Sequence, residues 1–129
     1  GELFVKAQLQ DDATLSNVAQ VKAKSKVLRA PLIVVAIASL KEHPKVPEIE
    51  QMLSAGAAVQ SMLLAAYAQD IGAMWRTGSM SYHPVVRDGL GVSQGEKIVG
   101  YIYMGKGESK ARVPTQLVVE DYVAEWPSA

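Results

Sequence analysis

The sequence predicts an α+β fold in a single domain that spans residues 1–129. Three segments carry most of this prediction: an apolar helix at residues 47–70, a β-branched run at 32–38, and a β-branched and aromatic run at 97–104. Further helical segments lie before the first run and between the helix and the last run. Helices and strands in this order indicate an α+β protein or a mixed α/β sandwich.

Residues 47–70 are predicted to form the longest helix, around which the rest of the chain is organised. Pro47 suits the first helical position, where a missing N–H costs nothing. Glu48 and Glu50 place negative charge at the positive end of the helix dipole. Gly72 follows as a C-terminal stop.

Most of the circumference of this helix is apolar, because Ser54, Gln60 and Ser61 are the only polar side chains between positions 52 and 68. We expect such a helix to be buried on most sides. Small residues at 54–58 allow a second backbone to approach closely. A packing surface within the chain and a seam between two copies are equally compatible with that pattern. The run is too short and too interrupted for a membrane span, which needs about 20 apolar residues.

The segments before the long helix are predicted with less detail. Residues 3–10 are too few to assign to a helix or a strand. Asp11 or Asp12 is expected to cap a helix that runs to Leu28. Its inward positions would be 15, 18, 21 and 28, and lysines 22, 24 and 26 would form a solvated outer face. The run at 32–38 predicts a strand that is covered on both faces.

After the long helix we expect a short strand at 73–77 and a brief helix at 84–90 that Ser81 caps. Gly100 in the middle of the strand at 97–104 indicates that a ligand or another part of the chain approaches closely there. Residues 106–114 form a charged, irregular segment. The partly apolar tail at 117–126 needs a surface to lie on, or adds a strand to the sheet.

Composition excludes several classes of function. Lysine plus arginine and aspartate plus glutamate both total 13, so no basic face for nucleic acid is indicated. Cysteine is absent, which excludes disulfides and thiolate chemistry and makes a cytoplasmic setting the default expectation. His43 and His83 are not at metal-ligand spacing and are expected at the surface. No metal site is predicted.

Two short stretches are candidates for a binding site. Residues 75–78, Trp-Arg-Thr-Gly, end a predicted strand, and the carboxyl ends of strands are common ligand sites. Lys110 and Arg112 are two cations spaced by one residue, an arrangement that can hold a phosphate. The alternatives are a buried Trp75 followed by an ordinary turn, and a solvated loop.

Several motifs taken together resemble the nitroreductase family, and in particular its minimal bacterial subgroup of small flavin enzymes. The similarity extends over about residues 27–114 and is carried by Arg29-Ala30-Pro31-Leu32-Ile33-Val34, Val46-Pro47, Glu50-Gln51, Ser54-Ala55-Gly56, Trp75-Arg76-Thr77-Gly78, Pro84-Val85-Val86-Arg87 and Lys97-Ile98-Val99-Gly100-Tyr101. The resemblance implies a long central helix packed on a mixed, mostly antiparallel sheet.

The same resemblance implies a homodimer with the long helix at the interface and FMN bound between the two chains. Trp75, Arg76, Thr77 and Gly78 would lie along the flavin ring, with the Thr77 N–H at flavin N5. Lys110 and Arg112 would contact the FMN phosphate. No side chain is assigned a catalytic role, because the flavin itself is the reactive group.

The implied activity is ping-pong reduction of a nitroaromatic, quinone or similar small acceptor by NAD(P)H. The alternative is a flavin-free module for dimerisation or for binding a small ligand. The chain resembles the later two-thirds of a nitroreductase domain, and the Arg-rich segment with which the family opens has no counterpart in it. From this we expect weak FMN binding, and a sheet edge that the tail at 117–123 or a second chain must cover.

Overall fold

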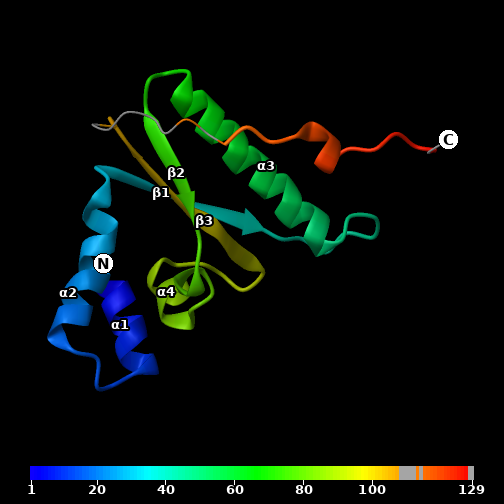
Figure 1. Cartoon of the computed structure of the whole chain (residues 1–129). Coiled ribbons are helices and arrows are strands. Elements are labelled where there is room, and N and C mark those ends of the chain that lie inside the picture. Colours follow the sequence, from blue (N-terminus) through cyan, green and yellow to red (C-terminus); the bar gives the residue numbers. More distant parts are fainter. Residues whose placement is uncertain (108–112, 114, 128–129) are drawn as a thin grey trace.

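A computed structural model describes residues 1–107, 113 and 115–127 of the chain. Its centre is a three-stranded sheet with helices on both faces (Figure 1). The strands are β1 (Leu32–Ser39), β2 (Gly72–Arg76) and β3 (Glu96–Gly105). The helices are α1 (Glu2–Asp11), α2 (Asn17–Ser25), α3 (Glu48–Tyr67) and α4 (Pro84–Gly89).

The strand order is β1-β3-β2, and β3 pairs antiparallel with both neighbours. The α+β class is therefore confirmed. Within the described residues the sheet has no parallel pair, so it is antiparallel rather than mixed. The three predicted strands are present at the expected places. β1 and β3 carry the β-branched and aromatic residues that favour extended backbone, whereas β2 carries only Trp75 of these and is held by its pairing with β3.

Two hydrophobic clusters lie on opposite faces of the sheet. On one face α3 packs through residues such as Met52, Ala55 and Val59 onto Val99 and Ile102. On the other face, residues of α1 and α4 pack onto β1 and β3; this cluster includes Phe4, Ala7, Val86, Ile98 and Tyr101. The prediction that the first strand is covered on both faces is confirmed, since Ile33 and Val35 join one cluster and Val34 and Ala36 the other.

A β-bulge interrupts the pairing of β1 with β3. Ala36 is opposite Gly100 and Ile37 is opposite Ile98, so Val99 is an extra residue on β3. An extra residue shifts the alternation of the strand by one position. Val99 and Ile102 consequently contribute to the cluster under α3, whereas Ile98 and Tyr101 contribute to the opposite cluster.

The predicted long helix is present, with different ends. Pro47 is its N-cap residue rather than the first helical residue. At the other end the Ile71 N–H donates to the Ala66 carbonyl at 2.9 Å, and the Asp70 N–H donates to the Tyr67 carbonyl at 3.1 Å. These two bonds form a Schellman motif, with Asp70 at φ 56° in the left-handed position. Asp70 rather than Gly72 therefore stops the helix, and Gly72 begins β2.

Helix α3 is not buried on most sides within one chain. Val59 and Ala66 are buried against the sheet. Large side chains on the outer surface stay exposed, among them Ile49, Leu53, Leu64 and Tyr67. The single chain therefore covers one face of this apolar helix and leaves the other uncovered.

The N-terminal region folds as two helices, and the predicted helix from residue 11 or 12 to Leu28 is wrong in its limits and in its inner face. Ser16 caps α2 by accepting from the Ala19 N–H at 3.3 Å. Val18, Val21 and Leu28 are 79%, 68% and 77% exposed. Ala23 is the buried residue of α2 instead. A helical period identifies an apolar face, but contact with α1 and with the short 3-10 helix at Lys26–Arg29 decides which residues are covered.

Helix α4 is capped by a histidine. His83 Nδ1 accepts from the Val85 N–H at 3.2 Å, and His83 Nε2 lies 3.2 Å from Asp11 Oδ1 on α1. The His83 side chain is 10% exposed, so the prediction that His83 lies at the surface is wrong. Ser81 does not cap this helix; it is buried in the 3-10 turn at Ser79–Ser81.

The described part of the tail adds no strand to the sheet. It extends away from the body of the protein (Figure 1), with one 3-10 turn at Val119–Asp121. Its large apolar side chains are exposed, including Leu117, Tyr122 and Trp126. No helix in the described ranges is long and apolar enough to cross a membrane.

We predict that Ile102→Ala lowers the free energy of unfolding by about 2–5 kcal/mol, because Ile102 is fully buried on the central strand. Val18→Ala, at an exposed position of α2, should change it by no more than about 0.5 kcal/mol. Urea unfolding followed by circular dichroism measures both. Equal effects of the two substitutions would contradict the described core.

Candidate functional site

Two adjoining cavities, of about 160 Å³ and about 450 Å³, lie on the face of the sheet opposite α3. They share Arg29, Arg76 and Tyr103 as lining residues. We refer to the pair as the basic groove. The smaller cavity extends to Thr77, Gly78 and Tyr101, and the larger one extends to Lys106 and Gly107.

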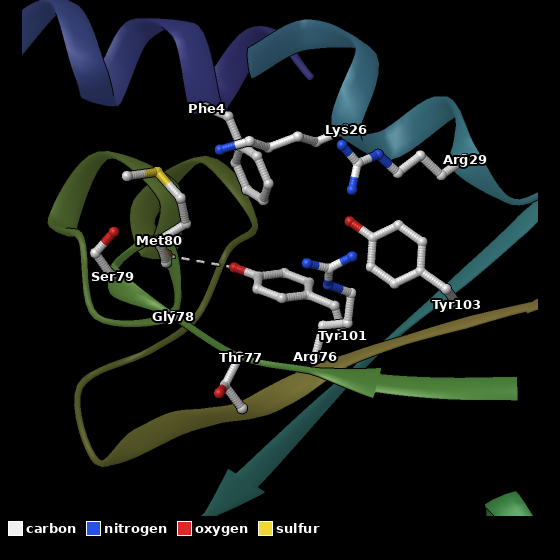
Figure 2. Close-up of a pocket in the computed structure, with 10 residues that line it drawn as sticks. All are labelled: Phe4, Lys26, Arg29, Arg76, Thr77, Gly78, Ser79, Met80, Tyr101 and Tyr103. Atoms are coloured by element: carbon white, nitrogen blue, oxygen red, sulfur yellow. Dashed lines mark hydrogen bonds between the residues drawn. The ribbon is translucent and has the colours of Figure 1, made fainter. Parts of the chain in front are cut away.

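The sheet register places the groove residues next to one another. Arg76 is opposite Tyr101 and Met74 is opposite Tyr103, so all four belong to one face of neighbouring strands. Lys26 and Arg29 come from the 3-10 helix that leads into β1. Figure 2 shows the guanidinium groups of Arg29 and Arg76 pointing toward the same space beside the Tyr103 hydroxyl.

The charged side chains that line the groove, among the described residues, are all cationic. Lys26, Arg29, Arg76 and Lys106 line it, and no carboxylate does so among the described residues. Within that part of the chain, the ion pairs join Lys24 to Glu2, His83 to Asp11 and Lys97 to Glu48, and they involve none of the four groove cations. Converging cations without acidic partners favour an anionic ligand.

The end of β2 offers backbone donors to this groove. Figure 2 shows the Thr77 side chain pointing away from the arginines, so Thr77 presents its backbone to the cavity. Among the loop and side-chain hydrogen bonds of the described residues, none is donated by the Thr77 or Gly78 N–H. Gly78 has φ 128° and ψ −176°, a conformation that is essentially restricted to glycine. An anion or a polar ring edge can therefore be bound here by main-chain N–H groups.

Tyr101 holds the turn that follows Gly78. Its hydroxyl donates to the Met80 carbonyl at 3.3 Å (Figure 2). The Phe4 and Tyr101 rings meet edge to face, with centroids 5.7 Å apart. Tyr101 is 6% exposed, and this burial raises the pKa of its hydroxyl above the ordinary value of 10.0. Tyr101 therefore remains a neutral donor at physiological pH.

Some of the site residues predicted from the sequence line the groove and others do not. Arg76, Thr77 and Gly78 line the groove. Trp75 does not, because its side chain lies on the α3 face, where its ring is within contact distance of position 56. Lys110 and Arg112 lie outside the described residues.

Sequence reasoning missed several groove residues, among them Lys26, Arg29, Tyr101, Tyr103 and Lys106. Lys26 was assigned to a solvated face and Arg29 to no site, because the 3-10 turn that brings both to the sheet leaves no mark in the helical pattern. Tyr101 and Tyr103 were recognised only as strand residues. Their two-residue spacing does place them on one face, and that was the available signal.

Comparison with known proteins assigns this chain to a family. The model of the nitroreductase family matches residues 2–106. The chain therefore belongs to the nitroreductase family. A solved nitroreductase-like family protein from Bacillus cereus superposes with a TM-score of 0.73 at 18% identity, over 98% of this chain and 68% of that one. At that identity the superposition supports the shared fold.

Two curated relatives are more similar in sequence. "Putative NAD(P)H nitroreductase YdjA" of Escherichia coli strain K12 is 46% identical over 90 residues, which cover 70% of this chain and 49% of the relative. "Putative NAD(P)H nitroreductase" of Haemophilus influenzae is 31% identical over 104 residues, which cover 79% of this chain and 56% of the relative. The chain thus spans about half the length of the curated relatives it matches.

We predict a stability difference at high pH that depends on Tyr101. Its folded-state pKa is raised, so the stability that it contributes is complete below pH 10.0 and is lost as the pH rises through the folded-state pKa. Tyr101→Phe has no proton to lose. The free energy of unfolding of the parent should therefore fall relative to that of Tyr101→Phe above about pH 10.

Urea unfolding at several pH values measures this difference, with Tyr122→Phe as the matched control at a tyrosine that is 72% exposed. Parallel pH profiles for the parent and Tyr101→Phe would show that the Tyr101 hydroxyl is not buried in the folded protein.

Proposed function

We propose that this chain carries the flavin site of an FMN-dependent NAD(P)H oxidoreductase that reduces nitroaromatic or quinone-like acceptors. The observation that supports this function is the basic groove, in which converging cations and the backbone N–H groups at Thr77 and Gly78 line one continuous space. The membership of the chain in the nitroreductase family and the names of its relatives support the same activity.

The groove residues fit the chemistry of FMN. The phosphate of FMN is an anion, and cations without carboxylate neighbours suit it. The isoalloxazine ring is planar with polar edges, and it suits the end where Tyr101, Tyr103 and the Thr77–Gly78 backbone meet. We therefore place the ring near Thr77 and Gly78, and the phosphate toward Lys106.

Lys110 and Arg112 follow Lys106 by four and six positions in the sequence. We propose that these two cations add to the phosphate end of the groove. Arg29 and Arg76, which both cavities share, would neutralise charge between the two ends.

When bound, FMN would supply the group that takes up a hydride from NAD(P)H and passes electrons to the acceptor. The protein's part is to bind and orient it. The Thr77 N–H would donate a hydrogen bond to the ring, which needs no side-chain acid. Tyr101, through the Met80 carbonyl, would keep the turn after Gly78 in place.

We further propose that the protein is a homodimer whose seam includes α3. The outer surface of α3 carries an exposed stripe at helical spacing, with Ile49, Leu53 and Leu64 each more than 60% exposed. Beside this stripe lie small exposed residues such as Ala57 and Ala58. An apolar surface of this kind is typical of a contact between proteins, and a second copy buries it symmetrically.

We predict that Ala58→Glu converts the dimer to a monomer, because it places a charge on the outer surface of α3. Ala55→Glu is less informative, since Ala55 packs into the core cluster under the helix. Ala13→Glu makes the same change at an exposed loop position and should leave the dimer intact. Sedimentation velocity of the parent, Ala58→Glu and Ala13→Glu proteins measures the oligomeric state. A folded Ala58→Glu dimer would argue against the seam.

FMN titration followed by quenching of flavin fluorescence tests the cofactor site. We expect saturable but weak binding, with a Kd above about 1 µM, because the groove is open and exposed charges are screened. Arg29→Ala should weaken binding by up to about fivefold, since an exposed charge contact contributes about 1 kcal/mol or less. Lys22→Ala, at an exposed cation of α2, is the control.

Lys110→Ala or Arg112→Ala alone should weaken FMN binding about ten- to a hundredfold, because one charge-assisted bond contributes about 1.5–3 kcal/mol, and the double variant should lose more than either. Unchanged affinity in that double variant would remove both residues from the phosphate site. An intact dimer that binds no FMN at all would favour the flavin-free module.

A further inference from the structure

Trp75 lies next to the groove residues in sequence but on the other face of the sheet. Its ring atom Cη2 is 3.5 Å from where a Cβ at Gly56 of α3 would lie. Arg76, Thr77 and Gly78, the next three residues, line the groove. The indole therefore sits between α3 and the strand end that leads into the candidate site.

The Trp75 indole also fills the space that Gly100 leaves on the central strand. A Cβ at position 100 would lie 2.6 Å from Trp75 Cδ1 and 2.8 Å from the Arg76 carbonyl oxygen, and closer still to Trp75 Nε1. Real Cβ atoms do not approach other atoms so closely, so this arrangement requires glycine at position 100. The predicted close approach at Gly100 is thus made by a side chain of the same protein.

A hydrogen bond fixes the indole in that position. Trp75 Nε1 donates to the Val99 carbonyl at 3.2 Å. Val99 is the extra residue of the β-bulge, and such a residue is left outside the regular ladder. The bulge therefore supplies both the acceptor for the indole N–H and the glycine notch beneath the ring.

We propose that Trp75 is a positioning residue for the groove. Its indole holds the last part of β2 against β3 immediately before the backbone leaves the sheet at Thr77. Peptide planarity leaves two soft torsions per residue, so an anchor at position 75 limits where the N–H groups of Thr77 and Gly78 point. This role rests on the proposed function, because those N–H groups are the proposed flavin donors.

The test uses the full chain with Trp75→Phe, which keeps an aromatic ring but lacks the indole N–H. Trp126→Phe is the matched control, because Trp126 is 93% exposed on the tail. Backbone amide NMR signals of residues 76–78 are recorded without ligand, and FMN affinity is measured by fluorescence quenching. Trp75→Phe should move these amide signals and weaken FMN binding about tenfold. Trp126→Phe should do neither.

A second comparison tests the notch itself. Gly100→Ala should lower the melting temperature by several degrees, because the added methyl meets the indole and the Arg76 carbonyl. The same substitution should cost less when Trp75→Leu is also present, since part of the clash is then removed. The two substitutions are in contact, so their effects should not add.

Unmoved amide signals at 76–78 together with unchanged FMN affinity in Trp75→Phe would overturn the positioning role, as would additive effects of Gly100→Ala and Trp75→Leu. The experiments distinguish a failure of the proposed cofactor site from a failure of the positioning role of Trp75. A parent chain that binds no FMN contradicts the proposed cofactor site, whereas the ligand-free amide signals and the double-variant comparison still decide the role of Trp75.

Discussion

The packing of the Trp75 indole into the notch at Gly100 is the constraint on which both faces of the sheet depend. The extra residue at Val99 turns Gly100 toward α3 and so makes room for the ring. The same shift in alternation turns Tyr101 and Tyr103 toward the opposite face. A regular strand would reverse these directions, because side chains alternate with a period of two. This single bulge therefore determines which side chains of β3 pack under α3 and which line the groove.

The two faces use the sheet differently. Under α3, apolar side chains interlock and exclude water, and this supplies a rigid base. On the other face α1 and α4 cover part of the sheet, and the part near Arg76 and Tyr103 stays open. A binding groove on a rigid sheet keeps its donors in place, which is what recognition of a planar cofactor requires. The outer surface of α3 remains exposed apolar area, for which a second chain is the proposed cover.

The charge of the groove is a local property. The chain as a whole has equal numbers of cationic and anionic side chains. No described carboxylate lines the groove, and three carboxylates elsewhere pair with Lys24, His83 and Lys97. Lys26, Arg29 and Arg76 are thereby left near one another on one face. Net charge therefore predicts nothing about the sign of this surface, because only the spatial arrangement of charges creates a local field.

The sequence by itself determined the three strands, the helix at 48–67, the family resemblance and the binding candidates at Arg76, Thr77 and Gly78. These depend on local propensity, on apolar periodicity or on short motifs that neighbouring residues carry. Tertiary structure decided the rest. The exposure of Val18 and Val21, the low exposure of the His83 side chain, and the meeting of Lys26 and Arg29 with Arg76 depend on contacts between distant segments. A periodic pattern shows that a face is apolar or charged, but only the packed fold decides what that face meets.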